Sequence, residues 1–308
     1  MSMVQGLATD KPILASAPAA TPSWLDRSLY PFQSRFLSLD GHRLHYIDEG
    51  SGPLLLFLHA NPLWSFQYRN LIRPLSARFR CVALDYPGFG LSDVRPDFQH
   101  SLIADSTLVE RFIRALELKD VTLVLHDTSI SIGLGVVTRH PDWFSGAVIS
   151  NGFAWPLSDD PGIYRFLQFV ASPLFRFMII QFNFLIRYGN ATLRSKFLVA
   201  ERRAYLMPFA DKRRRHHQHD LFRSILKSYD YLLDLKGRLA DIQTLPVLLA
   251  YAPGDPSYKA GFVERYENIF PNHHTVLIQG AHHFPQDEDP EAMVAAIQEW
   301  WDNFRHRT

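Results

Sequence analysis

The stretch of residues 121–133 constrains the fold of this chain more than any other. Residues 121–126 form an apolar run of typical strand length, rich in branched side chains. The run ends abruptly at Asp127, and a helical pattern follows up to the loop signal His140-Pro141. We therefore predict a buried strand, a sharp turn and a helix. Such a turn projects one side chain beyond the carboxyl end of the strand, where ligands bind.

Two residues compete for the exposed position of this turn. Ser131 lies in Ser129-Ile-Ser-Ile-Gly133, which resembles the turn of serine hydrolases. A strand extended to Ser131 would bury Asp127 and Thr128 in a parallel sheet, where both fit poorly, and would leave only about two turns of helix. Starting at Asp127 leaves about three turns. We therefore predict that Asp127 lies at the turn, as a nucleophile or, in a purely structural role, as the N-cap of the helix.

Short apolar runs separated by helical patterns recur along the chain. The runs are Leu54–Leu58, Val82–Leu84, Val121–Leu125, Ala147–Ile149, Val247–Leu249 and Thr275–Ile278. Continuous apolar runs are typical of strands buried on both faces of a parallel sheet. Residues 35–47 instead alternate apolar and polar side chains around Asp40-Gly41, as an antiparallel hairpin does. We predict an α/β fold with a doubly wound, mostly parallel sheet of eight strands.

The alternation of strand and helix stops between about residues 154 and 241. This region has helical patterns and many phenylalanines, but no convincing strand. We predict a helical cap over 154–241, between two parts of the core at 24–153 and 242–308, and a disordered tail at 1–23. The cap would cover the carboxyl ends of the strands, so some of its rings should line an apolar pocket while others form the cap's own core. We expect the basic run Lys212–His219 to be a solvated loop.

Composition narrows the classes of function. Thirty-two basic residues against thirty-one acidic ones provide no field for binding nucleic acid. The lone cysteine, Cys81, excludes an internal disulfide. The most apolar segment, residues 166–186, is broken by Pro173 and carries Arg176, which a membrane-spanning helix tolerates poorly. We expect a cytoplasmic protein without cofactor, metal, nucleic-acid partner or integral membrane segment; its oligomeric state stays open.

Three chemically capable side chains follow three of the predicted strands. Asp127, Asp255 and His283 occur in the order nucleophile, acid, histidine that is typical of α/β-hydrolases. In such a site the Asp127 carboxylate would form an alkyl ester, and His283 would deprotonate the water that hydrolyses it. Asp255 would orient the imidazole. The backbone amides of Thr128 and Asn61 would stabilise the oxyanion of the hydrolysis.

Five segments together resemble haloalkane dehalogenases. They are Trp24–Leu37, His59–Ser65, His126-Asp127, Tyr205–Phe209 and His283–Asp287. The resemblance covers nearly everything after residue 23. It implies the α/β-hydrolase fold, with Asp127, His283 and Asp255 as nucleophile, base and acid, and it makes Asn61 similar to the family's halide-binding asparagine. Some members take the acid from the loop after the preceding strand, but residues 150–152 offer no carboxylate here.

Two turns depart from the family's pattern. Ala60 stands where the family normally has glycine, and Thr128-Ser129 stand where its nucleophile turn normally continues with Trp-Gly. The missing tryptophan would aim its indole N–H at the leaving halide, and the shorter hydroxyl of Thr128 could hardly reach that point. The resemblance thus implies a small apolar organic substrate, but weak native dehalogenation.

The sequence leaves several functions open. Besides dehalogenation, the candidates are epoxide opening, for which a cap tyrosine must protonate the leaving oxygen, and cleavage of a lactone or ester. A non-catalytic ligand-binding protein with the same fold is the alternative outside enzymes, although a binder has no need of all three catalytic side chains. The residues expected to line the substrate pocket are Trp64, Phe153, Tyr164, Phe169 and Tyr205, of which Tyr164 and Tyr205 are the candidate acids.

Overall fold

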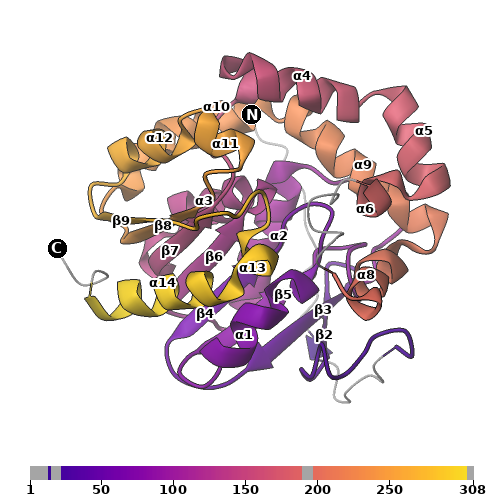
Figure 1. Ribbon diagram of the computed structural model, residues 1–308, viewed down its shortest axis with the longest axis horizontal. Helices are drawn as coiled ribbons and strands as arrows, with labels where there is room; N and C mark the ends of the chain where they lie inside the picture. The colour runs from indigo at the N-terminus through magenta and orange to yellow at the C-terminus, as the bar shows by residue number, and fades with distance from the viewer. Residues whose placement is uncertain (1–12, 15–21, 189–196, 304–308) are drawn as a thin grey trace, which may run out of the picture.

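The computed structural model describes residues 13–14, 22–188 and 197–303 (Figure 1). The disordered tail expected at residues 1–23 lies almost entirely outside these ranges, as does a short part of the region expected to form the cap.

The described residues form a single nine-stranded sheet in the order β1-β2-β3-β5-β4-β6-β7-β8-β9. Its strands are β1 Ile13–Leu14, β2 Arg35–Leu39, β3 His42–Glu49, β4 Leu54–Leu58, β5 Arg80–Leu84, β6 Val121–His126, β7 Phe144–Ser150, β8 Val247–Tyr251 and β9 His273–Leu277. The first three strands and the β3–β5 pair are antiparallel, and all other pairs are parallel. The eight predicted strands are confirmed. The two-residue β1, which was not predicted, extends the antiparallel edge.

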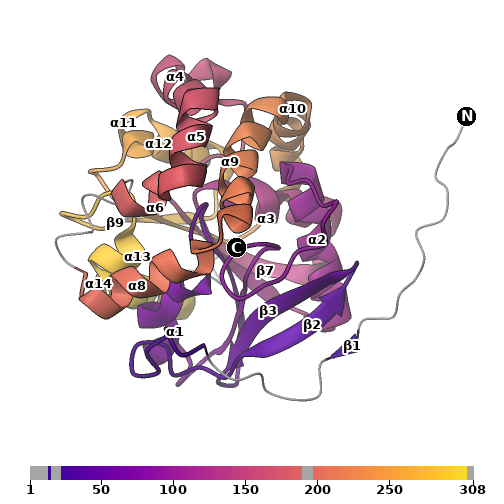
Figure 2. The ribbon, with the colours of Figure 1, turned by 90° about the vertical axis from the view of Figure 1, so that its right-hand side faces the viewer.

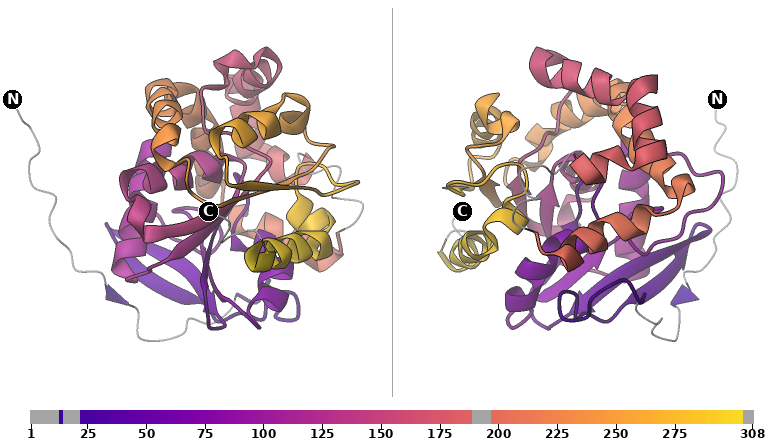
Figure 3. Two further views of the ribbon diagram at one scale, coloured as in Figure 1. Left: turned by 90° about the vertical axis from the view of Figure 1, so that its left-hand side faces the viewer. Right: turned by 45° about the vertical axis from the view of Figure 1, so that its right-hand side comes forward.

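Helices cover both faces of the sheet, because the apolar strands must be buried on both sides. The helices outside the region between β7 and β8 are α1 Arg69–Leu75, α2 Leu102–Ala115, α3 Thr128–Arg139, α11 Pro256–Lys259, α12 Phe262–Ile269, α13 Pro285–Glu288 and α14 Pro290–Asn303. Figures 2 and 3 show α1 and α14 packed together on one face, and α2 and α3 on the other.

The parallel strands are in a register that brings their carboxyl ends to one edge of the sheet. Leu58 at the end of β4 is paired with Leu125 of β6, which is paired in turn with Ile149 of β7, and Ile149 with Leu249 of β8. Every residue of β4 and β6 is buried. The loops that follow these strands therefore start from a rigid base and converge on one site.

A helical insertion separates β7 from β8. Its helices are α4 Pro161–Val170, α5 Pro173–Phe182, α6 Phe184–Tyr188, α8 Val199–Leu206, α9 Lys212–Lys227 and α10 Tyr229–Arg238. The insertion contacts the loops at the carboxyl ends of the strands, because Trp64 Nε1 after β4 donates to the carbonyl of Ala204 in α8 at 3.1 Å. In the loop after β5, Gly88 lies so close to His217 of α9 that an added Cβ would collide with the imidazole. The expectation of helices above this edge is therefore met, and the boundaries given for a cap domain remain a proposal.

Two expectations about this insertion need correction. The basic run Lys212–His219 is not a solvated loop, because it forms the first half of α9. Arg214 in that run donates hydrogen bonds to the carbonyls of Gly90 and Ser92, at 3.0 and 2.6 Å. The phenylalanines were expected to line a pocket or to form the core of the cap. Phe175 does belong to a small buried cluster, but four of the others are more than half exposed to solvent: Phe166, Phe169, Phe177 and Phe182.

None of the helices in the described ranges is long and apolar enough to cross a membrane by itself. The pair α4 and α5 meets the length and composition required for a span, but the two helices are bent by 56° at the break between them.

Candidate active site

Asp127 lies at the sharp turn between β6 and α3. Its φ of 55° and ψ of −129° place a non-glycine residue in a strained conformation, of the kind that costs on the order of 1–3 kcal/mol and gathers at functional sites. The turn approaches the loop after β7 so closely that a Cβ on Gly152 would lie 2.7 Å from Asp127 Cα. Ser129 stabilises the turn, because its Oγ accepts from the His126 amide at 2.8 Å.

The side chain of Asp127 is not used as a helix cap. It makes no capping hydrogen bond to the described first turn of α3, which removes the purely structural interpretation. Its Oδ2 instead accepts from the Thr128 hydroxyl at 2.8 Å. Burial raises the pKa of Asp127, although the charge of His283 and the hydrogen bonds from Thr128 oppose the rise. Ser131, the competing residue, lies inside α3 with its Oγ bound to the carbonyl of Phe153 at 2.6 Å.

His283 and Asp255 form the second part of the site. His283 Nδ1 lies 2.6 Å from Asp255 Oδ2, while Asp255 Oδ1 accepts from the Ser257 amide at 2.7 Å. Asp255 is almost completely buried, whereas the imidazole of His283 is 38% exposed. Burial lowers the pKa of His283, but the hydrogen bond and charge of Asp255 and the charge of Asp127 outweigh it and raise the pKa to about 9. Burial raises the pKa of Asp255, and the contacts with His283 and Ser257 hold it below its usual value.

Two polar side chains hold the backbone of His283 and were not identified from the sequence. His126 Nε2 lies 2.7 Å from the His283 carbonyl, and Asn151 Nδ2 donates to the same carbonyl at 3.2 Å. Burial and the charge of His283 lower the pKa of His126 to about 3, so its ring is neutral. The amide of Gln67 lies 2.7 Å from His126 Nδ1, and we infer that it donates there and leaves Nε2 as the proton donor. A histidine at the end of a fully buried strand of mostly apolar residues was the available signal.

The loop after β4 meets α9 at Asn61 and Gln218, which are both buried. Asn61, buried in the loop after β4, donates from Nδ2 to the backbone carbonyl of Gln218 in α9 at 3.3 Å. Among the described residues, Asn61 Oδ1 has no hydrogen-bond partner, and neither amide atom of the fully buried Gln218 side chain has one. Buried polar atoms without partners are rare and need an explanation. Nothing in the local pattern of the basic run around Gln218 indicated that it would meet Asn61.

The residues expected to line the substrate pocket occupy different environments. Trp64 and Phe153 are buried, and the Trp64 indole N–H is bound to the insertion as described above. Tyr164 is partly exposed on α4. Phe169 is 53% exposed and packs against Phe175, with 5.2 Å between ring centroids. Tyr205 is buried and donates its hydroxyl proton to Asp287 at 2.5 Å. Their roles in a pocket remain predictions.

Tyr205 belongs to a buried ionic cluster that links the insertion to the core. Arg69 of α1 contacts Asp287 of α13 and Glu201 of α8, each at 2.6 Å. The Tyr205 hydroxyl lies 3.4 Å from Arg69. Because its proton is held by Asp287, Tyr205 is poorly suited to protonate a leaving group. The cluster anchors α13, which starts two residues after His283.

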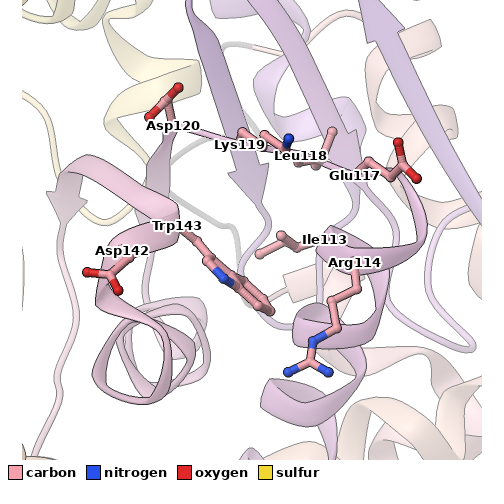
Figure 4. A pocket seen from close by; sticks show the side chains of 8 residues that line it. All are labelled: Ile113, Arg114, Glu117, Leu118, Lys119, Asp120, Asp142 and Trp143. Carbon is pink, nitrogen blue, oxygen red and sulfur yellow. The ribbon is translucent and has the colours of Figure 1, made fainter.

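A surface cavity of about 570 Å³ lies at the opposite edge of the sheet (Figure 4). It is lined by Leu118 and Asp120, which precede β6, and by Trp143, which precedes β7. Asp127 follows β6, so this cavity is separate from the site. Within the described ranges, no group of three or more His, Cys, Asp or Glu side chains is placed to hold a metal ion.

Comparisons with known proteins agree with this geometry. A family model described as alpha/beta hydrolase family matches residues 55–296. Haloalkane dehalogenase 2 of Mycobacterium tuberculosis is 34% identical over 280 residues, which cover 89% of this chain and 96% of the relative. A cis-3-alkyl-4-alkyloxetan-2-one decarboxylase of Shewanella oneidensis is 27% identical over 286 residues, covering 88% of this chain and 89% of the relative.

Solved structures show the same fold. The haloalkane dehalogenase DatA of Agrobacterium tumefaciens has a TM-score of 0.79 at 22% identity, covering 88% of this chain and 96% of that one. A putative ancestral haloalkane dehalogenase has a TM-score of 0.78 at 24% identity, covering 88% and 99%. Together with the turn at Asp127 and the strand order, these matches establish that the chain belongs to the alpha/beta hydrolase family, as a haloalkane dehalogenase-like member.

Proposed function

We propose that this enzyme cleaves a small apolar organic substrate by forming a covalent alkyl ester on Asp127, which water then hydrolyses. The observation that carries the proposal is the uncapped Asp127 carboxylate at a strained turn, across the site from the paired His283 and Asp255. A protein that only binds a ligand has no need of this combination. In this mechanism Asp127 displaces the leaving group from a saturated carbon, and the leaving group departs with the bonding electrons.

The charge of His283 supports the attack by Asp127 and the hydrolysis of the ester in different ways. In the free enzyme, the carboxylates of Asp255 and Asp127 raise the pKa of His283 and keep it protonated. The positive charge of His283 in turn opposes the rise in the pKa of Asp127 and so helps this carboxylate to stay ionised for the attack. Formation of the ester removes the negative charge of Asp127. The pKa of His283 must then fall, and the neutral imidazole can take a proton from the attacking water. Asp255 keeps the ring oriented and balances the charge that forms on it.

The residues proposed to contact the leaving group, Thr128, Asn61 and Gln218, favour a second candidate function, in which the leaving atom is an oxygen. The single proton of the Thr128 hydroxyl is donated to Asp127, so it is not available to a halide. Gln218 Nε2 instead has no described partner, and Asn61 Nδ2 has a second N–H besides the one that it donates to the Gln218 carbonyl, whereas Asn61 Oδ1 can only accept. These N–H groups suit the two oxygens of a carboxylate, which is the group that forms when Asp127 attacks the alkyl carbon of a lactone. A relative named an oxetan-2-one decarboxylase acts on such a ring.

The test is to trap the covalent intermediate. The His283→Phe variant is incubated separately with bromoalkanes, epoxides and oxetan-2-ones, and the intact protein is weighed after each incubation. We expect added mass on Asp127 with the substrate class that the wild-type enzyme turns over. Asp127→Asn in the same background is the matched control and must stay unmodified. A substrate that wild type turns over but that adds no mass to His283→Phe would exclude the alkyl-enzyme mechanism.

The serine alternative has its own check. Ser131→Ala should keep turnover, at the cost of about 1 kcal/mol for the lost buried hydrogen bond to Phe153. Loss of turnover in a variant that is still folded by circular dichroism would restore Ser131 as the nucleophile.

A further inference from the structure

The outer surface of the helical insertion gathers large apolar side chains. Figures 1 and 3 show α4 and α5 at the periphery of the molecule, away from the sheet. Isolated exposed apolar side chains are normal, but a group of them on two consecutive helices indicates an interaction surface. We define the apolar face as five side chains that are more than half exposed: Phe166 at 60%, Phe169 at 53%, Leu174 at 64%, Phe177 at 54% and Phe182 at 57%.

The charge of the chain is distributed very unevenly along the sequence, and the helices of the apolar face belong to its most basic part. Residues 161–227 hold thirteen of the 32 basic residues and only three of the 31 acidic ones, an excess of ten positive charges. The rest of the chain has nineteen basic and 28 acidic residues, an excess of nine negative charges. The near-neutral composition therefore conceals a strongly basic segment, residues 161–227, in a chain that is otherwise acidic. Residues 161–188, which carry the apolar face, contain no acidic residue at all.

The two helices are apolar on more than one side. Their inner side already packs in a small buried cluster of Val170, Phe175 and Ile179, so the exposed rings are additional to the core of the insertion. The two helices meet at a bend of 56°. Helices with one side packed on protein, another side apolar, and arginines at the margin suit the boundary between water and lipid. Arg165 and Arg176 are exposed on α4 and α5 and supply those arginines.

A cavity of about 520 Å³ opens beside the apolar face. Its lining is Met178, Gln181, Phe182, Phe184, Arg187 and Arg215. Arg215 donates to backbone carbonyls, including those of Ile180 and Phe209 at 2.8 and 2.7 Å, and has no carboxylate partner in the described part of the chain. Phenylalanine rings next to guanidinium groups can accept an anionic head group together with the start of its acyl chain.

We propose that the apolar face docks the protein on the surface of a bilayer that contains anionic phospholipids. The exposed rings would enter the boundary between head groups and acyl chains, and the surrounding arginines and Lys212 would contact phosphate groups. A second copy of the chain is a poor occupant, because pairing two such faces would bring two strongly basic regions together. The docking can be tested independently of the reaction on Asp127, since Phe166 and Phe177 of the apolar face are exposed and belong neither to the catalytic residues nor to the expected pocket.

The experiment measures co-sedimentation of the full chain with vesicles. One set of vesicles is phosphatidylcholine alone, and the other also contains phosphatidylglycerol. We expect binding to the anionic vesicles that weakens as NaCl is raised. Phe166→Ser combined with Phe177→Ser should reduce the partition coefficient at least about tenfold through lost apolar burial. Arg176→Gln combined with Lys212→Gln should reduce it about tenfold on anionic vesicles only. Ile103→Ser, a 56% exposed position on α2, is the matched control.

A tryptophan probe distinguishes insertion from loose electrostatic adsorption. In Phe177→Trp the emission of the new tryptophan should shift to the blue when anionic vesicles are added, and in Ile103→Trp it should not. Equal binding of wild type and the double phenylalanine variant would overturn the proposal, as would an absence of binding to either vesicle. A dimer in light scattering that the double phenylalanine variant dissociates would show that a second copy covers the face, and would also overturn it.

Discussion

The two sides of the active site differ in how their polar atoms are satisfied. On the side of His283, Asp255 binds the ring, and His126 and Asn151 hold the backbone. On the opposite side, the buried amides of Asn61 and Gln218 retain atoms without a described partner. Leaving such an atom unpaired costs on the order of 1–3 kcal/mol.

We infer that the two sides have different roles. The side of His283 is needed in every step of the reaction, whereas the side of Asn61 and Gln218 determines which leaving group is accepted. In the proposed mechanism, attack and hydrolysis require Asp127, His283 and Asp255 in a fixed geometry before a substrate arrives, and contacts within the protein hold the ring of His283 in place. A leaving group brings its own hydrogen-bonding atoms. We infer that Asn61 Nδ2 and Gln218 Nε2 donate hydrogen bonds to the leaving group, and that this side decides which compound is cleaved.

We expect the largest effect on turnover when the hydrogen-bonding partner of the His283 ring is replaced. Asp255→Asn leaves the shape of the site intact but favours the wrong tautomer of His283, and turnover should fall by about 10⁴. Because the first step does not need the base, the alkyl ester should accumulate and be visible by intact mass. Asp159→Asn, a half-exposed carboxylate of the insertion, is the control. Normal turnover by Asp255→Asn would remove Asp255 from the mechanism.

The second prediction tests the unsatisfied side. Gln218→Leu should lower kcat by about 10²–10³ if its amide stabilises the departing group. The free energy of unfolding should stay equal or rise, because an unpaired buried amide is replaced by an apolar side chain. This pairing of effects separates the proposed role from a structural one, which would lower stability and leave kcat unchanged. Urea unfolding and steady-state kinetics measure both, with the exposed Gln168→Leu as control.

The third prediction concerns a new hydrogen-bond donor to a leaving halide at position 128. Thr128→Trp would supply the indole donor that the chain lacks, and bromoalkane turnover should rise by about 10–100-fold provided that the ring packs in place of the buried threonine. Bromides should gain more than chlorides in absolute rate. Thr128→Val removes the hydroxyl at similar volume and should produce no gain. High chloroalkane turnover by the wild-type enzyme would mean that another group already donates to the halide.

The smallest expected effect concerns the pH dependence of stability. The pKa of His283 is raised from 6.5 to about 9 in the folded protein. Its contribution to stability is therefore complete below pH 6.5 and is lost as the pH rises through about 9. The loss should be modest, because the ring is 38% exposed to solvent. Urea midpoints at pH 6 to 10 should fall less in His283→Gln than in wild type; parallel curves would contradict the raised pKa.

The sequence alone determined the scaffold and the position of Asp127. Strand length, a run of branched apolar residues and the distance to His140-Pro141 placed the turn, because each is a property of neighbouring residues. The hairpin at Asp40-Gly41 and the six apolar runs were recognisable for the same reason. Local periodicity reports local structure, and buried parallel strands are its clearest case.

Only the tertiary structure decided what surrounds Asp127. Asn61 meets Gln218 across 157 positions of sequence, and His126 meets the backbone of His283 across the same separation. No local pattern encodes such contacts, since they depend on how the insertion packs over the sheet. The run Lys212–His219 looked solvated because its composition is basic, yet Arg214 and Gln218 are turned inward on α9. The phenylalanines of α4 and α5 looked alike in sequence, and only packing separated the buried rings from the exposed ones.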